Sequence, residues 1–140
     1  MGERDAQQRV GLLVCGGIGR IVSTVVRQAA YMVAGDRPEC VVLVSSGSLT
    51  GQVPEALEIA RTLPLIAVDA CEERCATAIV EGRDLTAEEI IWLPQVSAKH
   101  RLSIRGEDRK GLSERGMRLA RALADEIIAR VDALASGEGD

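Results

Sequence analysis

The stretch between Pro64 and Cys75 constrains the fold of this chain more than any other. Residues 65–68 are a short apolar run without alternation, entered through Pro64 and closed by Asp69. A run of this kind is typical of a strand that is buried on both faces of a parallel sheet. The segment therefore predicts a central strand that runs directly into a helix.

Two cysteines follow this predicted strand, at positions 71 and 75. Both are expected at the start of the helix, where a spacing of four residues puts the two sulfurs on one side, about one turn apart. The N–H groups and the partial positive charge at a helix N-terminus favour thiolate over thiol. The pattern predicts a metal or redox site, but it does not indicate a substrate.

The whole chain alternates between two kinds of segment. Apolar runs at residues 9–15, 40–44, 65–68 and 89–93 predict strands, and helical spacing at 18–35, after Pro54, at 76–82 and at 113–134 predicts helices. This order predicts one α/β domain with a three-layer, Rossmann-like fold: a parallel sheet of about four strands, helices on both faces and a long C-terminal helix. We expect an ordered core over residues 9–135 and a tail over 136–140.

Residues 95–112 show no clear period and are expected to form a long loop. Several basic side chains in it keep the loop in water or cover an anionic ligand. The apolar face of the last helix is interpreted as core or, in part, as a surface for a homo-oligomer.

Composition excludes some classes of function. The 140 residues include no Phe, one Tyr and one Trp, and the net charge is −4. Few aromatic rings and a negative charge disfavour binding to nucleic acid. No apolar run approaches the length of a membrane span, and no signal peptide is apparent, so a cytoplasmic protein is expected. In that compartment four cysteines indicate metal ligands, redox thiols or core residues rather than disulfides.

The predicted topology separates the four cysteines. Ligands of such folds lie beyond the carboxyl ends of the strands. Cys15 and Cys71 follow strand ends and Cys75 lies one turn further, whereas Cys40 begins its strand at the opposite edge. We therefore predict Cys15, Cys71 and Cys75 as metal ligands. Three thiolates leave one position of a tetrahedral metal open.

Other residues at this edge are candidates for supporting roles. Asp69, His100 or a bound anion could complete the metal's ligands, although Asp69 equally suits a helix cap and a lone loop histidine is usually solvated. Ser45 begins a hydroxyl-rich connection that suits a phosphate or a metal-bound ligand, or simply joins a strand to a helix. Gly16 and Gly17 would offer backbone N–H groups to a small anionic ligand.

Cys15 has a second interpretation. The loop from Cys15 to Arg20 reads CGGIGR, which resembles the Cys-x4-Arg loop of rhodanese-type sulfurtransferases and is one residue shorter than the Cys-x5-Arg loop of tyrosine phosphatases. In a metal-free sulfurtransferase or redox enzyme, Cys15 is the nucleophile and Arg20 holds an oxyanion or persulfide together with the glycine amides. Cys71 or Cys75 then resolves the intermediate as a disulfide.

Two segments carry a family resemblance. Residues 15–19 (CGGIG) and 66–75 (IAVDACEERC) resemble the zinc-binding proteins that are defined by an Asp-Gly-Cys motif, here Asp69-Ala70-Cys71. The resemblance implies four cysteines that hold zinc, with no established reaction. Ala70 replaces the family's glycine, and the remaining cysteine is expected near Ser45 rather than at Cys40.

A binding or scaffold protein with reduced core cysteines is the third interpretation.

Overall fold

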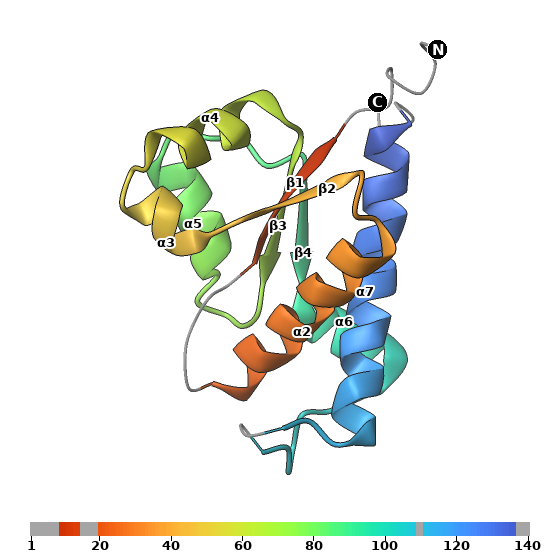
Figure 1. The fold of residues 1–140 in the computed structure, drawn as a ribbon. Coiled ribbons are helices and arrows are strands. Elements are labelled where there is room, and N and C mark those ends of the chain that lie inside the picture. Colours follow the sequence, from red (N-terminus) through yellow and green to blue (C-terminus); the bar gives the residue numbers. More distant parts are fainter. Residues whose placement is uncertain (1–8, 15–19, 109–110, 137–140) are drawn as a thin grey trace.

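A parallel sheet forms the centre of the computed structural model, which describes residues 9–14, 20–108 and 111–136. Within these ranges the sheet has four strands in the order β2-β1-β3-β4, and every pairing is parallel. The strands are β1 (Val10–Val14), β2 (Val41–Val44), β3 (Leu65–Asp69) and β4 (Glu89–Trp92). The predicted α/β fold is confirmed (Figure 1).

Helices cover both faces of the sheet (Figure 1). One core cluster joins the sheet to α2, α6 and α7, and the other joins it to α3, α4 and α5. The helices are α2 (Ile21–Asp36), α3 (Ser46–Thr50), α4 (Pro54–Thr62), α5 (Cys75–Gly82), α6 (Leu93–His100) and α7 (Glu114–Ala135). The predicted three layers and long last helix are therefore present.

The strands differ in burial as their places in the sheet require. All five residues of β3 are buried, as the unbroken apolar run predicts for a strand with neighbours on both sides. The outer strands β2 and β4 each expose one large apolar side chain, Leu43 and Ile90 respectively. The middle of the sheet, between β1 and β3, is thus its most protected part.

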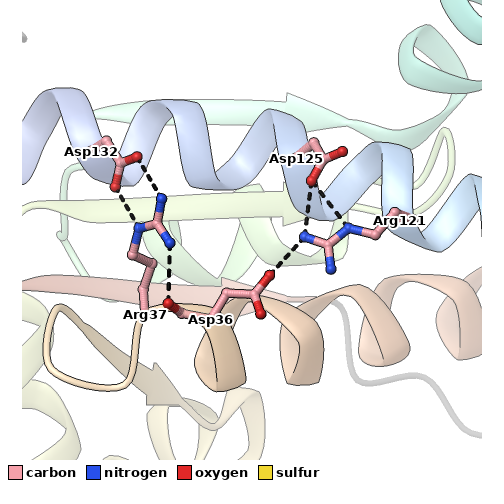
Figure 2. Close-up of polar contacts among 5 residues, drawn as sticks. All are labelled: Asp36, Arg37, Arg121, Asp125 and Asp132. Carbon is pink, nitrogen blue, oxygen red and sulfur yellow. Dashed lines mark hydrogen bonds and ion pairs between the residues drawn. The ribbon is translucent and has the colours of Figure 1, made fainter.

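An ionic network joins the end of α2 to α7 (Figure 2). Arg37 donates from Nε and Nη2 to the two carboxylate oxygens of Asp132, at 2.8 and 3.0 Å. Arg121 on α7 donates to Asp36 at 2.9 Å and to Asp125 on its own helix. The hydrogen bond from Arg37 lowers the pKa of Asp132 below its ordinary value of 3.8. The network joins two helices that also share an apolar interface.

Two helices replace predicted loops. The expectation of a loop throughout residues 95–112 is wrong, because α6 begins directly after β4 and runs to His100. Pro94 suits its first turn, and Leu93 and Val96 are buried. Leu93 is assigned to the preceding predicted strand, so Val96 is the one buried residue of α6 left in this segment, too little for a helical period to be recognised. Helix α3 has five residues and one buried side chain, Leu49, so the hydroxyl-rich connection after β2 shows no helical period either.

The long helix α7 begins at a cap built from side chains. The hydroxyl of Ser113 accepts from the Gly116 amide at 3.3 Å, and Glu107 accepts from the Ser113 amide at 2.7 Å. The Ser113 hydroxyl also donates to Glu107, whose carboxylate is almost entirely buried.

None of the helices in the described ranges, α7 included, combines the length and the apolar character that a membrane span needs.

Candidate site at the carboxyl edge of the sheet

The strand order places a switch point between β1 and β3. From β1 the chain crosses to β2 on one side, and from β2 it returns to β3 on the other side of β1. In doubly wound sheets the crevice for a ligand opens at such a point, beyond the carboxyl ends of the strands. Val14 at the end of β1 pairs with Val68, so the segment of residues 69–71 leaves the sheet beside the end of β1.

The turn that carries Cys71 is held by Trp92. The Cys71 carbonyl accepts from the Arg74 amide at 3.2 Å and from the Trp92 indole nitrogen at 2.9 Å. Arg74 has left-handed backbone angles (φ 51°, ψ 52°), and its guanidinium lies 4.4 Å from the centre of the Trp92 ring. A contact of a cation with an indole face at this distance is attractive. Trp92 therefore supports the turn with its nitrogen and with its ring.

The prediction that Cys71 and Cys75 share one helix is wrong. Helix α5 begins at Cys75, and Cys71 lies in the turn before it. The left-handed conformation of Arg74 interrupts the helical path, and the Cys71 carbonyl is bound by Arg74 and Trp92. Cys71 is half-buried, whereas Cys75 is exposed at the first position of α5. Both cysteines still lie at the carboxyl edge of the sheet, Cys71 in the turn after β3 and Cys75 at the start of α5.

Asp69 caps α5. Its side chain is fully buried at the end of β3, one oxygen accepts from the Thr77 amide at 3.1 Å, and the other accepts from the Thr77 hydroxyl. Thr77 is the third residue of α5, the position whose N–H normally needs a cap. With both oxygens bonded to Thr77, Asp69 acts here as a support for the start of α5. The carboxylate also occupies part of the positive end of that helix.

Arg20 connects the start of α2 to the cysteine turn. It is the N-cap residue of α2, and its Nη1 lies 3.2 Å from a carboxylate oxygen of Glu73. Both side chains are more than half exposed, at 51% and 67%. An ion pair in such a position contributes about 0–1 kcal/mol, so the guanidinium is held only weakly. The pair brings the β1–α2 and β3–α5 connections together at the switch point.

Of the remaining residues predicted at this edge, Ser45 lies within the described part of the chain. Cys15, Gly16 and Gly17 lie outside the described residues. Ser45 is exposed at the carboxyl end of β2, where its hydroxyl caps α3 by accepting from the Ser48 amide at 3.3 Å. Its strand pairs with β1 and is not adjacent to β3.

Two further candidates lie away from the switch point. Cys40 precedes β2 at the amino edge, and its carbonyl accepts from the Val10 amide at 2.8 Å. His100 ends α6, and its Nε2 lies 4.0 Å from a carboxylate oxygen of Glu126 on α7. Over the ranges that the structure describes, no group of three or more His, Cys, Asp and Glu side chains is arranged to hold a metal ion.

Sequence reasoning did not identify Trp92, Arg74 or Thr77 as parts of this edge. Trp92 offered a signal, because a tryptophan that is partly buried at the end of a strand usually needs a partner for its N–H. Arg74 offered none, since left-handed backbone at an arginine has no sequence signature. Thr77 could have been found from the cap that a helix beginning at Cys75 requires.

The fold and the site together define a doubly wound α/β protein with cysteines at the switch point of its sheet. The family model for the DGC domain matches residues 11–116, so the chain belongs to the DGC domain family. The matched segment contains both connections that meet at the switch point. Searches of curated proteins and of solved structures gave no match.

Proposed function

We propose that this protein binds zinc or another thiophilic metal through Cys15, Cys71 and Cys75. The observation that carries the proposal is the strand order. Cys15 follows Val14 in the sequence and Cys71 leaves the adjacent strand, so the two connections start from neighbouring strand ends. Membership of the DGC domain family agrees with a metal-binding role.

The chemistry of the described residues fits such a metal. Cys71 and Cys75 supply soft sulfur donors, which zinc and other thiophilic metals prefer. Asp69 is buried at the end of β3, and both of its carboxylate oxygens are bonded to Thr77. When bound, the metal would act as a structural clamp or as a Lewis acid, and the chain's own residues hold the two cysteines in place.

Trp92 and Asp69 are the residues that position the cysteines. Trp92 fixes the carbonyl of Cys71, and Asp69 fixes the start of α5 at Cys75. Residues that orient ligands in this way tune metal affinity without touching the metal. Arg20 and Ser45 lie at the same edge and suit a small anionic ligand at the open position of the metal.

The experiment is metal analysis of protein purified without a metal-binding tag, for the parent chain and four single variants. Elemental mass spectrometry is expected to give about one zinc per chain for the parent. Cys15→Ser, Cys71→Ser and Cys75→Ser should each lower this content. Cys40→Ser is the matched control, because Cys40 lies at the amino edge, and it should leave the content unchanged.

A second readout uses the single tryptophan. Because the Trp92 nitrogen is bonded to the Cys71 carbonyl, a chelator that removes the metal should change the fluorescence of Trp92 in the parent and in Cys40→Ser. Absence of metal in the parent chain, with one unusually reactive thiol at Cys15, would contradict the proposal. That result would favour the metal-free sulfurtransferase or redox enzyme, in which Cys15→Ser alone abolishes turnover.

A further inference from the structure

An apolar pocket lies beside the cysteine turn and is not used by the proposed metal ligands. Its volume is about 210 Å³, and its walls include Val22, Ala70, Leu93, Ile104 and Leu119. No charged side chain is present among the described residues that line it. The pocket therefore suits an uncharged group.

Three walls of the pocket continue directly into the cysteine site. Ala70 lies between the cap residue Asp69 and Cys71. Leu93 follows Trp92, whose indole nitrogen binds the Cys71 carbonyl. Val22 lies two residues after Arg20, which pairs with Glu73 in the cysteine turn. Three separate segments of chain thus run from the pocket wall to the residues that form or hold the cysteine turn.

The size and polarity of the pocket limit what it can hold. An engineered cavity of roughly 150 Å³ with aliphatic and aromatic walls binds benzene, so about 210 Å³ accommodates an aromatic ring with one or two further heavy atoms. The polar side chains in the wall already have partners. Ser97 donates to the Leu102 carbonyl, and Ser103 accepts from the Arg105 amide at 3.0 Å. An apolar group can therefore enter without leaving these hydroxyls unpaired.

We infer that this pocket binds the aromatic or branched aliphatic group of a small uncharged thiol, whose sulfur reaches the cysteine site. The apolar end of this ligand follows from the pocket alone. The thiol end rests on the proposed function, because a metal with three cysteine ligands has one position open for a fourth soft donor. The pocket then selects among thiols by the size and shape of the group that carries the sulfur.

The test compares toluene with benzyl mercaptan by ligand-observed NMR, on chelator-treated and on zinc-loaded protein. Toluene should bind both forms with a dissociation constant on the order of millimolar. Benzyl mercaptan should bind the zinc-loaded protein at least about tenfold more tightly than toluene does, with no such advantage in the chelated protein. Cys71→Ser should remove the advantage of the thiol and leave toluene binding unchanged.

A pair of substitutions separates the pocket from the rest of the surface. Val22→Phe fills the pocket and should weaken the binding of both probes by at least about tenfold. Ile90→Phe adds the same ring at an exposed position of β4 and should have no effect. Circular dichroism checks the fold of each variant, and Val22→Ala, which enlarges the pocket, should keep toluene binding.

The outcomes distinguish this inference from the proposed function. Absence of saturable toluene binding, or binding that Val22→Phe does not weaken, overturns the inference whatever zinc does. Toluene binding that Val22→Phe abolishes, in a protein that takes up no zinc, supports the pocket and overturns the metal site together with the thiol end. Zinc uptake with equal affinity for toluene and benzyl mercaptan overturns the thiol end alone.

Discussion

The indole nitrogen of Trp92 donates to the carbonyl of Cys71 at a distance of 2.9 Å. This bond ties the last residue of β4 to the turn that follows β3, and Trp92 pairs with Asp69 in the register of the two strands. One side chain thus links the sheet, the cysteine turn and the beginning of α6. The turn is therefore held both by the sheet, through Trp92, and by its own backbone, through the bond from the Arg74 amide to the Cys71 carbonyl.

Trp92→Phe is expected to destabilise the protein. The substitution removes the N–H and leaves a partly buried carbonyl without this donor, which typically costs about 1–2 kcal/mol, while the phenyl ring still offers a face to Arg74. Urea unfolding followed by circular dichroism measures the change. Tyr31→Phe, at an exposed aromatic residue, is the control. Equal stability of Trp92→Phe and the parent would mean that water replaces the indole nitrogen without loss.

Thr77→Val is expected to weaken the start of α5. Valine keeps the shape of the side chain but removes the hydroxyl that donates to buried Asp69, and an unsatisfied buried acceptor costs about 1–3 kcal/mol. Thr77→Ser keeps the donor and should retain most of the stability. Chemical denaturation of the two variants measures the difference. If they unfold at the same denaturant concentration, the bond from the Thr77 hydroxyl to Asp69 does not stabilise the fold.

The strands could be predicted because burial on both faces leaves a direct trace in the sequence. Each strand of the sheet is an apolar run, and the ends of these runs matched the ends of the strands to within one residue wherever the chain is described. The carboxyl edge followed from the alternation of strands and helices. The separation of Cys40 from Cys71 could therefore be predicted without coordinates.

The details of the site could not be predicted in this way. The position of Cys71 depends on a hydrogen bond from Trp92, 21 residues later, and on left-handed backbone at Arg74, neither of which is a local preference. The apolar pocket needs the end of β3, the start of α6 and the start of α7 to meet. Such features arise from tertiary packing, which overrides local patterns.

Gly116→Ala is expected to disturb the beginning of α7. A Cβ at this position would lie 2.5 Å from Oε1 of Glu107 and 2.8 Å from its Cδ, and Ser113 holds that carboxylate in place. Relief of the clash requires either loss of the bonds to Ser113 or a shift of the helix, which we expect to cost about 1–3 kcal/mol. The free energy of unfolding in urea measures the effect.

Gly35→Ala is the matched control for this substitution. Gly35 also lies in a helix, but a Cβ there meets nothing within 4 Å, so alanine should stabilise the protein by up to about 1 kcal/mol through its higher helix propensity. In a Glu107→Ala background this clash is absent and the contact with Cβ of Leu112 at 3.1 Å remains, so Gly116→Ala should then cost less than in the parent. A large cost that persists in this background would contradict the assigned clash.

Glu107 is expected to make the stability of the protein depend on pH. Hydrogen bonds from Ser113 hold the pKa of Glu107 below its ordinary value of 4.5. A carboxylate whose pKa is lowered by folding stabilises the folded state fully above its unfolded pKa, and this contribution is lost as the pH falls through the lower, folded value. Glu107→Gln should therefore be less stable than the parent at pH 7, and the difference should shrink below about pH 4.5.

Salt concentration distinguishes the contribution of Glu107 to stability from that of the exposed ionic network between α2 and α7. The Arg37–Asp132 pair is partly exposed, and at about 1 M salt charges are screened within roughly 3 Å. The difference in stability between the parent and Asp132→Asn should therefore fall when the salt concentration is raised to this value. The Glu107 carboxylate is buried against Ser113, so the difference in stability between the parent and Glu107→Gln should persist at high salt. The measurement is urea unfolding of the three proteins at two salt concentrations, over a pH series from 7 to 3. A difference between the parent and Glu107→Gln that stays constant across this series would show that the geometry of the cap, and not the charge of Glu107, stabilises the start of α7.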